Sequence, residues 1–111
     1  TPLYSSAASD VYKRQGEQLE NLKTKTILET AIKLVSGQRH TDYGDKVENH
    51  KNISSLWSAY LDKTITPHDV AIMMCLLKIA RTKLGAVSED TYVDGSAYMA
   101  IAGECKSHEQ D

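Results

Sequence analysis

The segment "TPHDVAIMMCLLKIARTKLG", residues 66–85, carries the strongest folding constraint in the chain. Thr66 is a residue that caps helix N-termini, Pro67 suits the first helical position, and Asp69 stands at the third. Lys83 and the glycine two residues later have the character of a helix end. The sequence therefore predicts a helix with well-defined limits between these residues.

This predicted helix is apolar on nearly every side. From Val70 to Ala80 only Lys78 interrupts the run of apolar residues. A helix that is hydrophobic all round belongs in the interior of a helical protein. We therefore expect it to lie at the centre of a bundle and to be the most buried helix, with Met73 and Leu77 in the core.

Three further segments, 22–36, 46–61 and 89–105, have apolar residues at three- and four-residue steps, which indicates amphipathic helices. Asp45 and Ser88 stand where the second and fourth of the predicted helices need N-caps. No segment alternates as a strand would. The predicted fold class is all-α, a small four-helix bundle.

The helix predicted over 46–61 has one apolar stripe, which we expect to be buried along its whole length. The residues of this stripe are Val47, His50, Ile53, Leu56, Trp57, Tyr60 and Leu61.

The first twenty residues have no apolar periodicity, and we expect an unstructured tail there. The stretch "SDVYKRQ", Ser9 to Gln15, resembles the translation of a transposon mosaic-end sequence used to tag sequencing libraries. Residues 1 to about 15 are then adapter-derived, from assembled metagenomic reads, and are excluded from the argument about the fold. Residues 21–107 are expected to form a single helical domain.

Composition and charge narrow the classes of function. With 41% hydrophobic and 25% charged residues the chain has an ordinary globular composition, and its net charge of −2 argues against general nucleic-acid binding. No apolar run approaches the ~20 residues that span a bilayer. The N-terminus has no apolar targeting segment, and Cys75 and Cys105 lie in apolar helical patterns. We expect buried reduced thiols and a cytoplasmic location in a bacterial host.

Two carboxylates suggest a site. Asp90 and Asp94 are four residues apart, so they share one helix face, and Tyr98 continues that line. Because Asp94 precedes an apolar helix interior, we expect it to be partly buried and to need a cation. That cation is either Mg²⁺ or the basic pair of Lys78 and Arg81, which share a face of the preceding helix. The spacing leaves both alternatives open.

Other polar residues have simpler interpretations. Glu48 and Asp69 lie near helix starts, where capping and the helix dipole account for carboxylates. Tyr43 lies in "RHTDYGD", which is typical of a tight turn. His50 is not at metal-ligand spacing from another histidine or a cysteine, so we interpret it as a non-ligand.

Three segments, in order, resemble a phage and prophage family known as a domain of unknown function. They read "DYGDKVENHKNISSLWSAYL", "TPHDVAIMMCLLKIARTK" and "DTYVDGSAYMAIAGE". The chain also resembles, more distantly, the MazG-like all-α nucleotide pyrophosphohydrolases, which hold Mg²⁺ against a triphosphate with acidic residues on two helices. The later acidic pair here is D-x-x-x-D, and no E-x-x-E is present within the expected helical domain, residues 21–107.

The MazG-like resemblance implies roles for particular residues. Asp90, Asp94 and Glu48 are the metal ligands that it implies, and Glu48 or Asp69 is the catalytic base. The residues implied for substrate binding are Tyr43, Lys78, Arg81 and Tyr98. The implied cofactor is Mg²⁺, and the implied substrate is a nucleoside triphosphate or a modified nucleotide.

Two functions therefore remain open. The first is a phage-type, Mg²⁺-dependent nucleoside triphosphate pyrophosphohydrolase or an inactive relative of one. The second is a non-enzymatic helical binding module of a phage or prophage, in which the same polar residues hold two helices together and protein partners are contacted elsewhere. No membrane partner is expected, and the sequence is compatible with a homo-oligomer. Direct contact of Lys78 or Arg81 with Asp94 would favour the second function.

Overall fold

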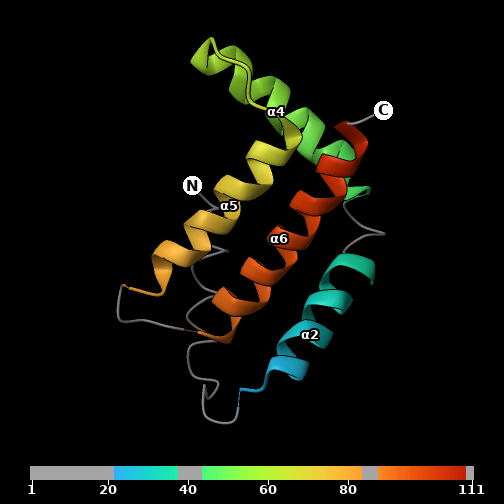
Figure 1. Cartoon of the computed structure of the whole chain (residues 1–111), viewed down its shortest axis with the longest axis vertical. Coiled ribbons are helices and arrows are strands. Elements are labelled where there is room, and N and C mark those ends of the chain that lie inside the picture. The colour runs from blue at the N-terminus through green and yellow to red at the C-terminus, as the bar shows by residue number, and fades with distance from the viewer. Residues whose placement is uncertain (1–21, 38–43, 84–87, 110–111) are drawn as a thin grey trace, which may run out of the picture.

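The computed structural model describes residues 22–37, 44–83 and 88–109 of the 111-residue chain. Within these ranges the chain forms four α-helices and no strands, so the all-α prediction is confirmed (Figure 1). The helices are α2 (Thr24–Ser36), α4 (Lys46–Leu61), α5 (Pro67–Arg81) and α6 (Glu89–Glu109). The predicted tail, residues 1–20, which includes the stretch interpreted as adapter-derived, lies outside the described residues.

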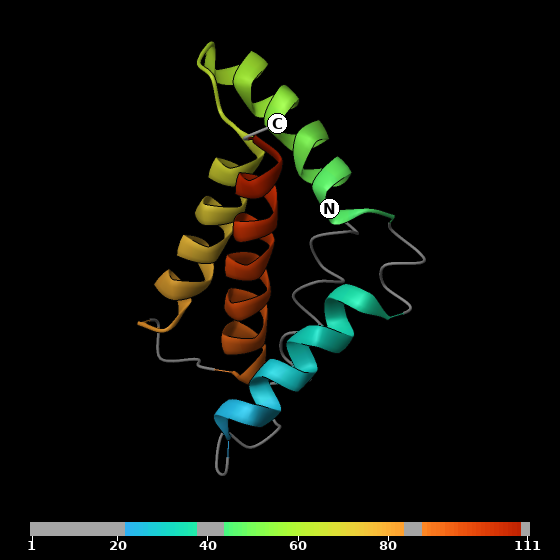
Figure 2. The same cartoon turned by 45° about the vertical axis from the view of Figure 1, so that its right-hand side comes forward.

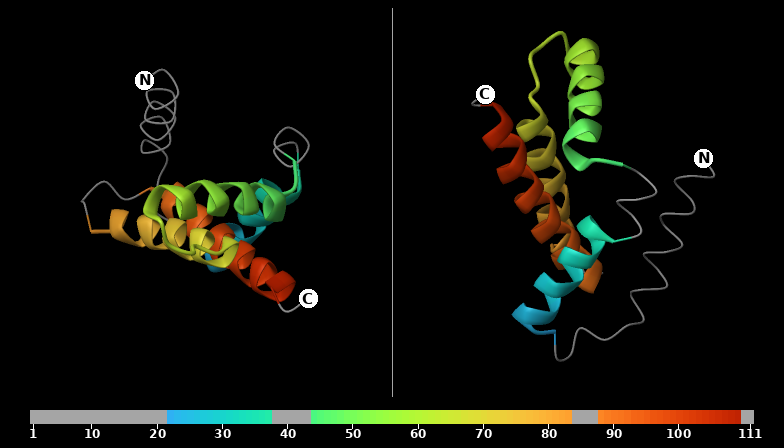
Figure 3. Two further views of the ribbon diagram at one scale, coloured as in Figure 1. Left: turned by 90° about the horizontal axis from the view of Figure 1, so that it is seen from above. Right: turned by 90° about the vertical axis from the view of Figure 1, so that its right-hand side faces the viewer.

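Helix α6 is the central element. It runs between α5 on one side and α2 on the other (Figure 1), and these are the two most extensive helix contacts in the described part of the chain. Helix α4 packs at the end of the molecule where α5 begins and α6 ends (Figure 3). The core therefore forms around α6 and not around α5.

The core consists mainly of small side chains. One cluster joins α4, α5 and α6, and its buried members are Val47, Ala71, Ile101, Ala102 and Cys105. A second cluster joins α2 and α6 through Ala31, Val93 and Ala97. Alanines at these contacts let the helix backbones approach closely, so that a short chain can form a packed core.

Both cysteines are free thiols, as predicted. Cys105 is fully buried, whereas Cys75 is half-buried. Burial raises the pKa of the Cys105 thiol, so it stays protonated and unreactive.

The caps predicted for α4 and α5 are present. Asp45 accepts hydrogen bonds from the backbone N–H groups of Val47 and Glu48 at 2.7 and 3.1 Å. Thr66 Oγ1 accepts from the Asp69 N–H at 3.0 Å, and the Asp69 carboxylate accepts from the Thr66 N–H at 3.0 Å. This reciprocal capping box fixes where α5 begins.

Replacing Thr66 with alanine is expected to lower the free energy of unfolding by about 1 kcal/mol, because the Asp69 N–H loses its acceptor. Thr30→Ala is the control, since the Thr30 hydroxyl bonds only the exposed Thr26 carbonyl within α2. A urea melt compares the two variants with the wild type. Equal midpoints for all three proteins would show that the box is not stabilising.

The capping box also predicts a response to acid. The hydrogen bond from the backbone N–H of Thr66 holds the pKa of the Asp69 carboxyl below its ordinary 3.8. A carboxyl with a lowered folded-state pKa stabilises the fold fully above its unfolded pKa, and that contribution is lost as pH falls through the lower folded value. Asp69→Asn should therefore flatten the loss of stability below about pH 4 in acid melts.

The prediction that α5 is the most buried helix is wrong. Val70 and Ala71 are fully buried, but Met73, Leu76 and Leu77 are 42%, 55% and 44% exposed. Helix α6 covers one side of α5 and α4 contacts its start, while its outer face has no described helix against it (Figure 1). The apolar composition of α5 predicted its burial, but α5 lies at the edge of the layer that it forms with α6 and α2.

The buried stripe predicted for α4 is also only partly confirmed. Val47 and His50 are buried, whereas Leu56, Tyr60 and Leu61 are 62%, 89% and 51% exposed. The end of α4 extends beyond the other described helices (Figure 2), and there its Ser58 hydroxyl bonds the backbone of Ile65 in the segment that follows.

Candidate functional site

The polar centre of the molecule is an ion pair between α5 and α6. Lys78 Nζ lies 3.1 Å from Asp94 Oδ2, and the two side chains are only 12% and 19% exposed. Of the two cations that the spacing left open for Asp94, the structure shows the ammonium of Lys78 in direct contact. This contact is the one expected if polar residues hold the two helices together. We call the pair of Lys78 and Asp94 the polar seam between α5 and α6.

The backbone beside the pair explains how it forms. Gly95 follows Asp94, and a Cβ there would lie 3.7 Å from Lys78 Cβ, which is ordinary van der Waals contact. Cys75 Sγ, one turn before Lys78, donates to the Gly95 carbonyl at 3.5 Å. A small residue on α6 thus lets α5 approach, and the approach brings Lys78 to the carboxylate.

Asp94 also lines a cavity of about 240 Å³ on the other side of α6, bounded by α2, α4 and α6. The polar residues of its wall, besides Asp94, are Lys46, Asn49, His50 and Tyr98. The rest of the wall is apolar. Tyr98, predicted to bind substrate, is therefore placed near Asp94, on the same side of α6.

His50, which the sequence placed on the buried stripe of α4, is buried, but it has contacts that the sequence did not predict. Its Nδ1 donates to the Lys46 carbonyl at 2.7 Å, and its ring meets Tyr98 edge-on with centroids 6.3 Å apart. This hydrogen bond assigns the proton to Nδ1 in the neutral ring. The buried Nε2 has no hydrogen-bond partner among the described residues. The only signal in the sequence was a histidine in an apolar stripe.

Lys46, which lines the cavity, links α4 to α2, since its Nζ donates to the Val35 carbonyl at 2.8 Å. Val35 lies in the last turn of α2, so this bond satisfies a carbonyl that the helix end leaves without an intrahelical donor.

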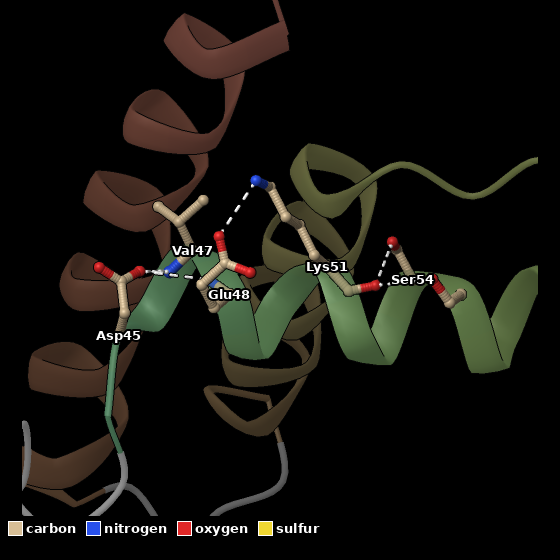
Figure 4. Close-up of polar contacts among 6 residues, drawn as sticks. Asp45, Val47, Glu48, Lys51 and Ser54 are labelled. Atoms are coloured by element: carbon tan, nitrogen blue, oxygen red, sulfur yellow. Dashed lines mark hydrogen bonds and ion pairs between the residues drawn. The ribbon is translucent and has the colours of Figure 1, made fainter.

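The other predicted site residues that the structure describes lie on α4, α5 and α6. Glu48 is exposed on α4 and pairs with Lys51 at 3.2 Å, as Figure 4 shows. Asp69 is held in the capping box of α5. Asp90 is half-buried in the first turn of α6, and Arg81 is half-buried in the last turn of α5. Tyr43 lies outside the described residues.

The described residues do not bring the predicted metal ligands together. Across residues 22–37, 44–83 and 88–109, no group of three His, Cys, Asp or Glu side chains is placed so that it could hold a metal ion. Glu48, Asp69, Asp90 and Asp94 all belong to these ranges. Mg²⁺ as a cofactor stays a prediction, with no set of described ligands to receive it.

Among residues 22–37, 44–83 and 88–109, no helix has the length and apolar character needed to cross a bilayer.

Residues 26–106 match the family described as a domain of unknown function, DUF6378. The chain belongs to this family. The match covers most of the chain, from α2 to the last turn of α6, and confirms the phage-family resemblance recognised in the three sequence segments. No solved structure matches the chain.

Two phage proteins are similar to the chain. The Gene 55 protein of Mycobacterium phage L5 is 48% identical over 77 residues, which cover 68% of this chain and 49% of the phage protein. The Gene 55 protein of Mycobacterium phage D29 is 43% identical over 75 residues, covering 68% of this chain and 50% of that protein. The chain thus spans about half the length of these relatives.

Proposed function

We propose that the chain is a non-catalytic helical binding module of a phage protein. In this proposal the polar seam between α5 and α6 is structural, and the exposed apolar helix faces contact a protein partner. The observation that carries the proposal is the ion pair of Lys78 and Asp94 at 3.1 Å. A carboxylate compensated by an ammonium at this distance has no need of a metal ion.

The exposed apolar side chains support the second half of the proposal. Large apolar residues on α4 and α5 expose from 42% to 89% of their surface, among them Leu56, Tyr60 and Leu76. Exposed apolar patches on a soluble domain mark interaction surfaces, and these side chains are the candidates for one here.

Calorimetric titration of the wild-type protein with Mg²⁺ tests the proposal. Without nucleotide we expect heats no larger than those of dilution, because Lys78 already neutralises Asp94. With a nucleoside triphosphate present we expect no heat beyond that of Mg²⁺ binding to the nucleotide in the absence of protein. A saturable heat in the wild type that disappears in Asp94→Asn, with stability unchanged, would contradict the proposal.

A second candidate is the Mg²⁺-dependent nucleoside triphosphate pyrophosphohydrolase. It is supported by the cavity that Asp94 shares with His50 and Tyr98. The cavity of about 240 Å³ is smaller than the ~300–1,000 Å³ of typical small-molecule sites, which weighs against a triphosphate. A screen for Mg²⁺-dependent pyrophosphate release over ordinary and modified nucleoside triphosphates decides between the candidates.

A further inference from the structure

The outer face of α5 carries a regular seam. Its members, at alternating steps of four and three residues, are Asp69, Met73, Leu76, Ala80 and Lys83. This is the repeat by which two helices pack side by side over several turns. The helical course continues to the last member, because the N–H groups of Thr82 and Lys83 donate to the carbonyls of Ile79 and Ala80.

The seam faces away from the rest of the described chain. Met73 and Leu76 are 42% and 55% exposed, and Ala80 and Lys83 are exposed as well. Leu77 borders the seam and is 44% exposed. Figure 1 shows α5 at the outer edge of the layer, on the side of α6 away from α2.

The seam is complementary to itself in the antiparallel direction. Leu76 is its middle member, and an acidic residue ends it on one side and a basic residue on the other. A two-fold axis at Leu76 would place Asp69 opposite the partner's Lys83 at both ends, and Met73 opposite the partner's Ala80. Charges then pair and a large side chain faces a small one, as close packing of helices requires.

The length of the helix fits this arrangement. Asp69 and Lys83 are fourteen residues apart, or about 21 Å along a helix at 1.5 Å per residue, so one pairing covers the whole seam. Asp69 carries a negative charge at neutral pH, as an ordinary aspartate does, and the hydrogen bond from the Thr66 N–H lowers its pKa further. Antiparallel helices also bring opposite ends of their dipoles together.

We propose that α5 is a self-association surface, through which two copies of the chain pair by antiparallel packing of their α5 helices about Leu76. This inference rests on the proposed function, since it identifies the protein partner as a second copy. An interface centred on one helix lies at the small end of the range for specific complexes, below about 1,200 Å², so we expect a reversible, concentration-dependent dimer.

Sedimentation equilibrium of the full chain over a wide range of concentrations tests the surface. Leu76→Glu should remove the dimer, because two carboxylates would meet at the two-fold axis. Met99→Glu on α6 is the matched control, since Met99 is 57% exposed against 55% for Leu76. We expect a dimer for the wild type and the control, and a monomer with wild-type circular dichroism for Leu76→Glu. A wild type that stays monomeric, or a Leu76→Glu variant that stays dimeric, would overturn the proposal.

Lys83→Glu tests the direction of packing. It places a carboxylate opposite the partner's Asp69 at both ends, and we expect the dimer to weaken about tenfold at low salt, with the difference shrinking as salt is added. Exchanging the charges in Asp69→Lys/Lys83→Glu should restore association, with circular dichroism monitoring the capping box. A Lys83→Glu protein that dimerises like the wild type at low salt would overturn the antiparallel arrangement.

The two proposals can fail separately. A monomeric wild type that shows no Mg²⁺ heat contradicts only self-association. A dimer that binds Mg²⁺ through Asp94 contradicts only the proposed function.

Discussion

Replacing Asp94 with asparagine is expected to destabilise the fold by about 3 kcal/mol, because it leaves the Lys78 ammonium uncompensated between two packed helices. The ammonium and the carboxylate lie 3.1 Å apart, and both side chains are more than four-fifths buried. Asparagine keeps the shape and removes the charge, so the loss measures electrostatics and not packing. A urea melt at neutral pH gives the free energy of unfolding.

An exposed ion pair of the same length supplies the control. Glu48 and Lys51 lie 3.2 Å apart, but their side chains are 70% and 51% exposed (Figure 4). Pairs in water contribute roughly 0–1 kcal/mol, since solvent screens them. We expect Glu48→Gln to change stability by less than about 0.5 kcal/mol. Equal effects at Asp94 and Glu48 would show that burial does not strengthen the ion pair of Lys78 and Asp94.

A double-mutant cycle separates the pair from its surroundings. Lys78→Met alone should destabilise, because the Asp94 carboxylate is then left half-desolvated and without its cation. Lys78→Met combined with Asp94→Leu removes both charges, and we expect it to recover most of the loss of either single variant. An additive result, with the double variant as unstable as the sum, would mean that the two residues act independently.

Local features of the fold could be predicted from the sequence. The start of α4 at Lys46 and of α5 at Pro67 followed from Asp45 and Thr66, because caps depend on residues within one turn of each other. The end of α6 was less predictable. It extends to Glu109, four residues past the predicted Cys105, and a Lys106–Glu109 ion pair at 3.3 Å lies in its last turn. No glycine or proline stands next to Glu109 to indicate where the helix ends.

Features that depend on neighbours could not be predicted. The sequence showed that Asp94 needs a cation, but the choice between Lys78 and Mg²⁺ depends on how closely α5 approaches α6 at Gly95. It also showed that α5 is apolar all round, but not which helix lies against each side. The burial of His50 was expected from the apolar stripe, but its contact with Tyr98 was not, since that contact arises only when α4 meets α6.

The second large effect is expected at Ile101. Leu77 on α5, also an aliphatic residue, is the comparison. Ile101 is 8% exposed and packs in the cluster with Val47, Ala71 and Cys105. Ile101→Ala should lower the free energy of unfolding by about 2–5 kcal/mol, since it removes buried methyl groups and leaves a void. It also borders the cavity of about 240 Å³, which the truncation would enlarge, so relaxation cannot easily close the space.

Leu77→Ala is the matched comparison, because sequence alone gave Leu77 a core position whereas the structure leaves it 44% exposed. A half-exposed leucine loses less on truncation, and no closed cavity forms. We expect a cost below about 1.5 kcal/mol in urea melts at a protein concentration low enough to keep the chain monomeric. A cost for Leu77→Ala equal to that for Ile101→Ala under those conditions would mean that α5 is covered within a single chain. The outer face of α5 would then be unavailable to a second copy. A larger cost for Ile101→Ala than for Leu77→Ala is therefore the result expected if α6 is central and the outer face of α5 is exposed.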